Sequence, residues 1–171
     1  MHKKIADLIS SIGKAYQIIP KDYPFVGSLP QEYILNFSLS HSLKHMVKKV
    51  GRLARKEVAP QSGDDIEKAL YSLLISSFKM AELLKINEQK ISKAIILTTN
   101  GEYKLQLMQL LVDMSYLADL LEEADHGTPL AEAEIEKARL YVINCIDDIC
   151  ALARSKGITM KVFFSEAHLH I

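Results

Sequence analysis

The chain has 171 residues, a length that allows one domain with a substantial apolar core. Hydrophobic residues make up 49% of it and charged residues 25%, a globular composition that excludes a largely disordered chain. The 21 basic and 21 acidic side chains balance, so no overall positive charge favours nucleic acid or an anionic membrane surface.

A short amphipathic helix is predicted at the start of the chain, since apolar residues recur there at helical spacing: Ile5, Leu8, Ile9, Ile12 and Tyr16. Polar residues such as Asp7 and Lys14 interrupt this segment, so it is predicted to be neither a secretory signal nor a transmembrane span. We therefore expect a cytoplasmic protein without a membrane partner. Cys145 and Cys150 lie five apart on one predicted helix and diverge, so we expect free, buried thiols.

The second helix is predicted to follow an extended connection that is rich in proline. The segment Ser28-Leu29-Pro30-Gln31 has the form of a capping box, which marks a helix start. The helix is expected to run to about Glu57, because Pro60 and Gly63 follow.

Three more helices are expected in the middle of the chain. Asp64 or Asp65 can cap the third helix. Asn87 can cap a fourth, shorter helix that ends near Asn100-Gly101. A fifth helix, rich in leucine and methionine, is expected over residues 102–125.

The sixth helix is predicted to begin with Thr128 as N-cap and Pro129 at its first helical position. It should end at Lys156-Gly157, since glycine is the usual residue after a helix C-terminus. A short seventh helix is expected from Thr159. No segment alternates strongly enough to predict a strand, so the expected fold class is all-α.

A short sequence pattern occurs twice. Ile66-Glu67-Lys68-Ala69 recurs as Ile135-Glu136-Lys137-Ala138, and Leu-Tyr follows each copy within a few residues. Such units cannot bury an apolar face alone, so two copies are expected to pack together. The sequence predicts a single all-α domain over residues 1–171, a helical bundle of about seven helices with related units at about 30–100 and 102–168.

Two segments resemble MazG-type nucleotide pyrophosphohydrolases. Leu73-Leu74-Ile75-Ser76-Ser77-Phe78-Lys79-Met80-Ala81-Glu82-Leu83-Leu84-Lys85-Ile86-Asn87 is similar to the end of the family's third helix. Lys48-Lys49-Val50-Gly51-Arg52-Leu53-Ala54 is similar to its Glu-Glu-Leu-Gly-Glu-Leu-Ala segment. The resemblance covers about residues 40–95 and, more loosely, 108–165. It implies an all-α fold that usually dimerises and uses Mg²⁺, held by Glu-x-x-Glu and Glu-x-x-Asp, to cleave nucleoside triphosphates to monophosphate and pyrophosphate.

In the first copy the metal-binding positions of the family carry other residues. Its Glu-x-x-Glu positions fall on Lys49 and Arg52, and its Glu-x-x-Asp positions on Ala69 and Ser72. Two cations in place of two carboxylates cannot hold Mg²⁺. Lys49 and Arg52 are instead candidates for binding the phosphates of a substrate.

The second copy keeps more of the family pattern. Asp113 matches the first acid, but Tyr116 replaces the second. On the other helix the match is Tyr141 and Asn144, or Asn144 and Asp147 if the alignment slides by one turn. Oxygen ligands from facing helices suit Mg²⁺, so the candidate metal ligands are Asp113, Asn144, Asp147 and Asp148, with Asp119 or Glu122 a turn or two along. The competing interpretation, which we favour, is that Asp147 or Asp148 faces solvent or pairs with a basic residue of the first copy.

Charged residues are distributed unevenly along the chain. His41 and His45 are four apart, but no third metal ligand is indicated, so a solvent-facing pair is expected. The second helix carries a basic stripe: Lys44, Lys48, Lys49, Arg52, Arg55 and Lys56. The later hairpin is acidic: Asp119, Glu122, Glu123, Asp125, Glu132, Glu134 and Glu136. We rank their mutual pairing first, within the bundle or across a homodimer, a solvated face second and nucleic-acid binding third.

The sequence leaves two main hypotheses for function, with nucleic-acid binding through the basic stripe as a third. The first is a Mg²⁺-dependent pyrophosphohydrolase that takes a nucleotide, as the resemblance implies. The second is a non-catalytic helical bundle that works as a binding or regulatory partner, which the lost carboxylates of the first copy favour. No glycine-rich phosphate loop, paired-cysteine motif or nucleophile elbow occurs in the sequence.

Overall fold

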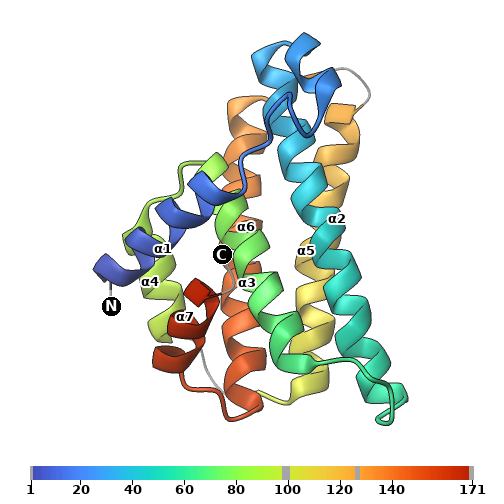
Figure 1. The fold of residues 1–171 in the computed structure, drawn as a ribbon, viewed down its shortest axis with the longest axis vertical. Coiled ribbons are helices and arrows are strands. Elements are labelled where there is room, and N and C mark those ends of the chain that lie inside the picture. Colours follow the sequence, from blue (N-terminus) through green and yellow to red (C-terminus); the bar gives the residue numbers. More distant parts are fainter. Residues whose placement is uncertain (1, 98–100, 126–127, 170–171) are drawn as a thin grey trace.

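The computed structural model describes residues 2–97, 101–125 and 128–169. Over these residues the chain forms seven α-helices and one short 3-10 helix and no strand, which confirms the predicted all-α fold class (Figure 1). In chain order the elements are α1 His2–Ala15, η1 Pro24–Ser28, α2 Gln31–Val58, α3 Ile66–Leu83, α4 Glu88–Leu97, α5 Tyr103–Asp125, α6 Glu132–Ser155 and α7 Met160–Leu169.

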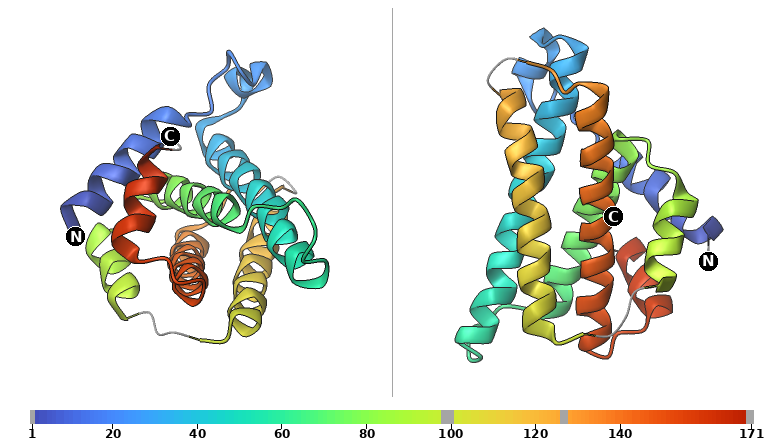
Figure 2. Two further views of the ribbon diagram at one scale, coloured as in Figure 1. Left: turned by 60° about the horizontal axis from the view of Figure 1, so that its bottom comes forward. Right: turned by 180° about the vertical axis from the view of Figure 1, so that it is seen from behind.

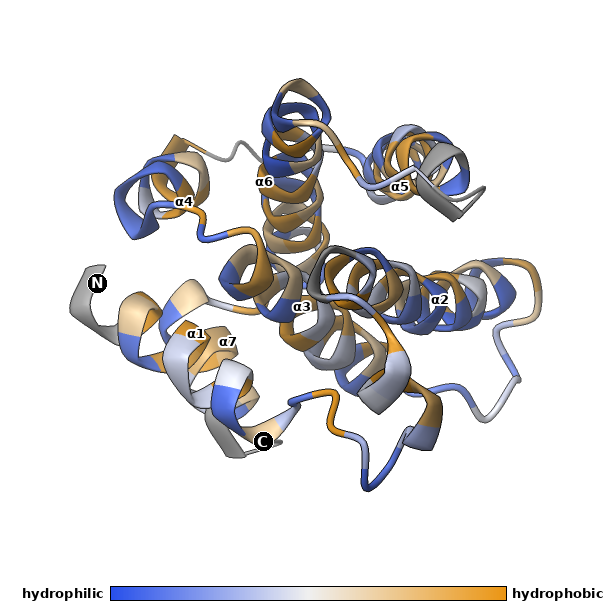
Figure 3. Ribbon diagram, turned by 90° about the horizontal axis from the view of Figure 1, so that it is seen from above, coloured by the Kyte–Doolittle hydropathy of each residue, from blue (hydrophilic) through white to orange (hydrophobic). Residues whose placement is uncertain are grey.

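The helices form three layers, with α3 and α6 packed together in the middle (Figure 2). The long helices α2 and α5 cover one side of this central pair, and the shorter α1, α4 and α7 cover the other. Seen from above, apolar residues gather where the helices face one another (Figure 3). The central pair therefore carries the core, and its largest fully buried side chains include Leu70, Leu73, Leu74 and Phe78 on α3.

The two halves of the chain are arranged alike. Each is built as long helix, long helix, short helix: α2, α3 and α4, then α5, α6 and α7. Within each half the two long helices pack together, and the short helix packs on the central helix of the other half, α4 on α6 and α7 on α3. These contacts are exchanged when the halves are exchanged, whereas the packing of α1 on α3 and of α7 on α6 has no counterpart of similar extent.

The turns after α3 and α6 have the same geometry. Lys85 and Gly157 both adopt positive φ, 52° and 79°. The next residue in each turn donates its backbone N–H to a carbonyl five positions back, Ile86 to Ala81 at 2.9 Å and Ile158 to Ala153 at 3.0 Å. This is the Schellman motif, with a buried isoleucine after the left-handed residue. The predicted glycine stop at Gly157 is confirmed.

Two of the predicted helix caps are confirmed. The Asp65 carboxylate accepts the backbone N–H of Lys68 at 3.0 Å, so Asp65 is the N-cap of α3. The Asn87 side-chain oxygen accepts the backbone N–H of Gln89 at 2.8 Å at the start of α4. Both residues have short polar side chains that reach the unpaired N–H groups of the first turn.

Two other predicted caps are wrong. Ser28 belongs to η1 and donates to the Phe25 carbonyl at 2.7 Å, so α2 begins without a side-chain cap. The sixth helix begins at Glu132 rather than Pro129, and the Glu134 carboxylate accepts the Ala131 N–H at 2.7 Å. The chain stays extended before α6 because it buries Leu130, which is 9% exposed.

Cys145 and Cys150 are buried, free thiols, as predicted. Burial raises the pKa of each thiol, so both stay protonated at neutral pH. Across the described part of the chain, no helix combines the length and the apolar character that a bilayer-crossing helix needs.

The paired turns predict opposite effects of two substitutions. Lys85→Gly relieves a left-handed backbone conformation and should raise the free energy of unfolding by about 1 kcal/mol. Gly157→Ala introduces the same strain and should lower it by about 1 kcal/mol. Urea denaturation followed by circular dichroism measures both changes. Equal signs for the two variants would contradict this account of the turns.

Candidate cationic pocket and buried acid pair

A pocket of about 490 Å³ lies between α2, α3 and the connection from α1 to α2. Five of its lining side chains are basic or can become so: His41, His45, Lys49, Lys68 and Lys79. The remaining walls combine small polar residues with apolar and aromatic ones, among them Ser72, Ser76, Tyr16, Tyr23, Ile18 and Ile75. We call this region the cationic pocket.

Helical periodicity places the basic residues on facing surfaces. On α2, His41, His45 and Lys49 are spaced by four residues and lie on one face. On α3, Lys68 and Lys79 are separated by three turns and face α2 across the pocket. Because α2 and α3 pack side by side along their length, both rows line the same cavity.

The lysines of the cationic pocket lie close enough to affect one another. Partial burial lowers the pKa of Lys49, and the nearby charges of Arg52, Lys68 and Lys48 lower it further. Burial also lowers the pKa of Lys79. Asp22 is the acidic residue among the described lining residues. None of the ion pairs between described residues involves Lys49, Lys68 or Lys79. The pocket therefore keeps an excess of positive charge.

An aromatic cluster attaches the connection between α1 and α2 to the rim of the pocket. The hydroxyl of Tyr23 lies 3.1 Å from Nε2 of His41, within hydrogen-bond distance. The rings of Tyr23 and Phe37 meet edge to face at 5.8 Å between centroids, and those of His41 and His45 lie 4.7 Å apart. These contacts bring Tyr23 to the edge of the cavity.

The histidine pair was expected to face solvent, which holds for the exposed His45 but not for His41. His41 is half-buried and both imidazoles line the cationic pocket. Burial lowers the pKa of each, and neighbouring charges add to the effect: His45 and Lys79 act on His41, and Lys48 and Lys79 on His45. Both rings are therefore mainly neutral at pH 7 in the absence of an anion.

Of the two predicted phosphate-binding residues, Lys49 lines the cationic pocket and Arg52 does not. Arg52 is exposed one helical turn along α2, close enough to lower the pKa of Lys49. Sequence inspection missed Lys68, Lys79 and Tyr23. The two lysines could have been found by pairing the polar faces of α2 and α3, whereas Tyr23 reaches the rim through a loop whose path no periodicity describes.

The predicted pairing of the basic helix with the acidic hairpin is absent from the ion pairs of the described residues. Arg55 pairs with Asp64 at 3.1 Å, in the loop that follows its own helix. Arg139 pairs with Glu132 and Glu136 within α6. The side chains of Glu123 and Asp125 lie outside those described. The ion pair that joins the basic helix to the second half of the chain is Glu57 with Lys156 at 3.4 Å, which uses the opposite charges from those predicted.

A second polar cluster lies between α5 and α6. Asp113 and Asp148 are only 5% and 7% exposed. The Asp113 carboxylate accepts two side-chain N–H groups, from Asn144 at 3.1 Å and from Gln109 at 3.1 Å. Asn144 and Asp148 share one face of α6, whereas Asp147 is rotated by about 100° from Asp148. The structure thus brings together three of the four predicted metal ligands, Asp113, Asn144 and Asp148.

The carboxyl group of Asp148 lies close to that of Asp113. Burial raises the pKa of Asp148 to about 8, and the charge of Asp113 and a hydrogen bond to its carboxylate act in the same direction. At neutral pH the Asp148 carboxyl is therefore largely protonated and donates to Asp113. Its other oxygen, Oδ2, has no hydrogen-bond partner. We call these two residues the acid pair.

The acid pair does not fit Mg²⁺ as the resemblance implies. Mg²⁺ requires six oxygen ligands and usually keeps several waters, but both carboxyl groups are buried. Amide N–H groups, rather than oxygen ligands, approach Asp113 from Asn144 and Gln109. The described residues contain no group of three or more histidine, cysteine, aspartate or glutamate side chains that could hold a metal ion.

No protein-family model, curated protein or solved structure matches this chain. Membership of the MazG-type family therefore stays a prediction that depends on the short sequence segments given above. The chemistry available to the protein has to be inferred from the cationic pocket and the acid pair.

The acid pair predicts how stability depends on pH. Asp148 holds its proton in the folded state up to about pH 8, while an unfolded aspartate loses it near pH 4. The folded state binds more protons between these values, so the free energy of unfolding falls as pH rises from about 4 to about 8. Asp148→Asn keeps a neutral donor for Asp113 and should remove this contribution, raising stability by about 2 kcal/mol or more at pH 8.

Urea denaturation of wild type and Asp148→Asn at intervals between pH 5 and pH 8 measures the effect. The stability difference between the two proteins should widen with pH. Asp147→Asn is the matched control, since the neighbouring carboxylate is only half-buried, and it should keep the wild-type slope. A pH-independent difference between wild type and Asp148→Asn would show that Asp148 is ionised in the folded protein.

Proposed function

We propose that the protein binds a phosphate-bearing small molecule of the nucleotide class in the cationic pocket, without a metal ion and without cleaving it. The observation that carries this proposal is the convergence of Lys49, Lys68 and Lys79 with His41 and His45 around one cavity. Their positive charge has no carboxylate partner among the described ion pairs. An anion would relieve the mutual repulsion that lowers the Lys49 pKa.

The shape and composition of the cationic pocket support a ligand larger than free phosphate. Its volume of about 490 Å³ falls in the usual range for small-molecule sites. Lysine ammonium groups and serine hydroxyls suit phosphate oxygens, while the rings of Tyr16 and Tyr23 and the side chain of Ile75 offer apolar surface for the rest of the molecule. This composition matches an anionic head attached to a flat, partly apolar group.

Removing one lysine of the cationic pocket should weaken ligand binding. We expect Lys49→Ala and Lys79→Ala each to raise the Kd for ADP by about 10- to 100-fold, the loss of one charge-assisted contact. Isothermal titration calorimetry in EDTA measures this without metal. Lys48→Ala is the matched control, because Lys48 is exposed on the same helix but does not line the pocket.

Two ligands separate the possible sources of the anionic group. Inorganic pyrophosphate tests the phosphate contacts alone, and ADP adds a base and a sugar. Tighter binding of ADP than of pyrophosphate supports the nucleotide class, and equal binding restricts the proposal to the phosphate group. Wild-type protein that binds neither ligand at millimolar concentration overturns the proposal.

The histidines predict that anion binding strengthens as pH falls. A bound anion raises the pKa of His41 and His45 from their lowered values, so binding takes up protons. Affinity for sulfate, whose charge is constant over this range, should increase by about 3- to 10-fold between pH 7.5 and pH 5.5. His45→Gln should flatten the profile. An unchanged profile in His45→Gln would mean that His45 does not titrate with binding.

Mg²⁺-dependent release of pyrophosphate from nucleoside triphosphates is the second candidate function. The convergence of Asp113, Asn144 and Asp148 favours it, since these are three of the residues that the family resemblance selects. The burial of both carboxyl groups opposes it. Pyrophosphate release that depends on Mg²⁺ and disappears in Asp113→Ala would overturn the proposal of binding without cleavage. We expect no pyrophosphate release by the wild-type protein from the common nucleoside triphosphates.

A further inference from the structure

The helix α5 is apolar on both of its faces. Its inner face is buried in the bundle through Leu107, Leu110, Met114, Leu117 and Leu121. Its outer face exposes Leu105, Met108, Val112 and Tyr116, which are 60%, 63%, 43% and 49% exposed. A helix on the surface of a monomer normally has one apolar face and one polar face. The outer apolar residues of α5 are therefore unexplained by the fold of a single chain.

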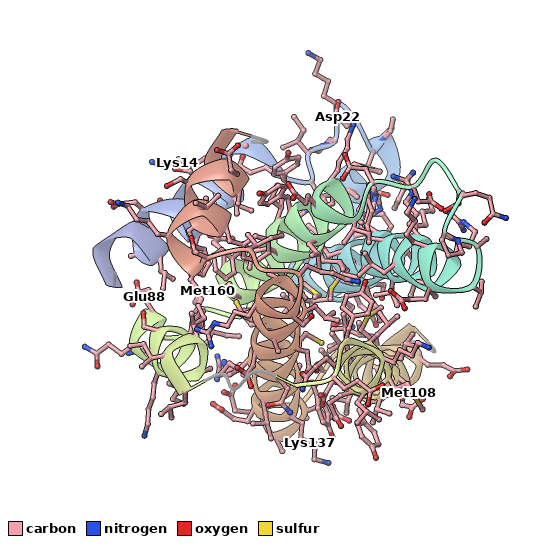
Figure 4. All side chains as sticks on the ribbon, turned by 90° about the horizontal axis from the view of Figure 1, so that it is seen from below. Lys14, Asp22, Glu88, Met108, Lys137 and Met160 are labelled. Carbon is pink, nitrogen blue, oxygen red and sulfur yellow. The ribbon has the colours of Figure 1, made fainter. Side chains whose placement is uncertain are left out.

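These four residues form one continuous stripe. Their spacings of three, four and four residues place them along a single side of the helix. Helix α5 stands at the edge of the bundle, where its main contacts are with α2 and α6, and Met108 lies on its outer side (Figure 4). We call Leu105, Met108, Val112 and Tyr116 the outer stripe.

Helix α6 extends the apolar surface beside the outer stripe. The ring of Tyr116 stacks on that of Tyr141 with 5.3 Å between centroids and 21° between planes. Leu140, the neighbour of Tyr141, is 55% exposed. Exposed aromatic and aliphatic residues that cluster in this way are typical of protein interfaces rather than of free surface.

We propose that the outer stripe packs against the same stripe of a second copy of the chain, with the two α5 helices antiparallel about a two-fold axis at Val112. The stripe is nearly symmetric about that residue, because Met108 and Tyr116 lie four positions to either side of it. Antiparallel packing brings Met108 of each copy to Tyr116 of the other and Val112 to its own equivalent. A self-complementary surface of this kind is what a two-fold dimer requires.

The charges that flank the outer stripe favour the antiparallel direction. Lys104 lies near its start, and Asp119 and Glu122 lie near its end, all exposed. Lys104 and Glu122 are five full turns apart and so lie on the same flank of the helix. In the antiparallel dimer Lys104 of each copy lies opposite position 120 of the other, about 3 Å along the axis from Glu122 and within reach of it, whereas parallel packing would bring like charges together.

The dimer is independent of the cationic pocket. The lining residues of that pocket come from α2, α3 and the connection before α2, and none comes from α5. Failure of ligand binding and failure of dimerisation are therefore separate results. The interface also differs from the one expected from sequence, since it uses the apolar stripe rather than the basic helix and the acidic hairpin.

Sedimentation velocity over a range of protein concentrations tests the interface. We expect wild type to dimerise and Val112→Asp, which brings two carboxylates together at the axis, to weaken the dimer by at least about 100-fold. Val162→Asp is the matched control, because Val162 is 49% exposed on α7, which covers the other side of the central pair from α5, and its variant should dimerise like wild type. Circular dichroism establishes that both variants are folded. A monomeric wild type, or a Val112→Asp variant that still dimerises, overturns the proposal.

Cysteine substitution tests the direction of the two helices. Val112→Cys should form an intermolecular disulfide on mild oxidation, since residue 112 faces its equivalent across the axis. Leu105→Cys should not, because the two copies of residue 105 lie about 21 Å apart along antiparallel helices. The native Cys145 and Cys150 are buried and do not compete. Equal cross-linking by both variants would indicate parallel helices and overturn the antiparallel arrangement.

Discussion

The contact between α3 and α6 is the constraint on which the rest of this structure depends. Both helices lie in the middle layer, and each of the other α-helices packs on α3, on α6 or on both. Their mutual surface is apolar and fully buried, as at Leu73 and Phe78 on α3 and Ile146 and Ile149 on α6. Polar residues on these two helices therefore lie away from this surface, as Lys68 and Lys79 of α3 do toward α2 and Asp148 of α6 does toward α5.

The two halves use this common frame differently. In the first half, α2 and α3 direct Lys49, Lys68 and Lys79 into a cavity that reaches solvent. In the second half, α5 and α6 direct Asp113 and Asp148 toward each other and bury them. The matching turns at Lys85 and Gly157 show that the backbone is equivalent even though the side chains have opposite charge. The asymmetry between the halves is one of side-chain chemistry and burial, not of fold.

The sequence predicts those features that depend on local physics. Helical periodicity predicts the fold class, and the short polar side chains of Asp65 and Asn87 predict two helix starts. Ser28 and Thr128 do not act as caps, because capping requires a particular backbone conformation that the neighbouring residues also influence. Before α6, Leu130 is buried and the helix begins two residues later, at Glu132. The cationic pocket depends on the register of α2 against α3 and on the path of the loop that carries Tyr23. The periodicity of a single helix predicts neither of these.

Burial decides which charged cluster can act on a ligand. A carboxylate pair open to water could replace its bound water with a cation. Here burial raises the pKa of Asp148, so this carboxyl group holds a proton and no cation is needed. Lys49 and Lys79 are only partly buried, and burial lowers the pKa of each without removing its charge at neutral pH. They keep their positive charge facing an open cavity, and an anion can approach them from solvent. The positive half of the molecule therefore presents its charge to solvent, whereas the acid pair of the other half is buried in the core.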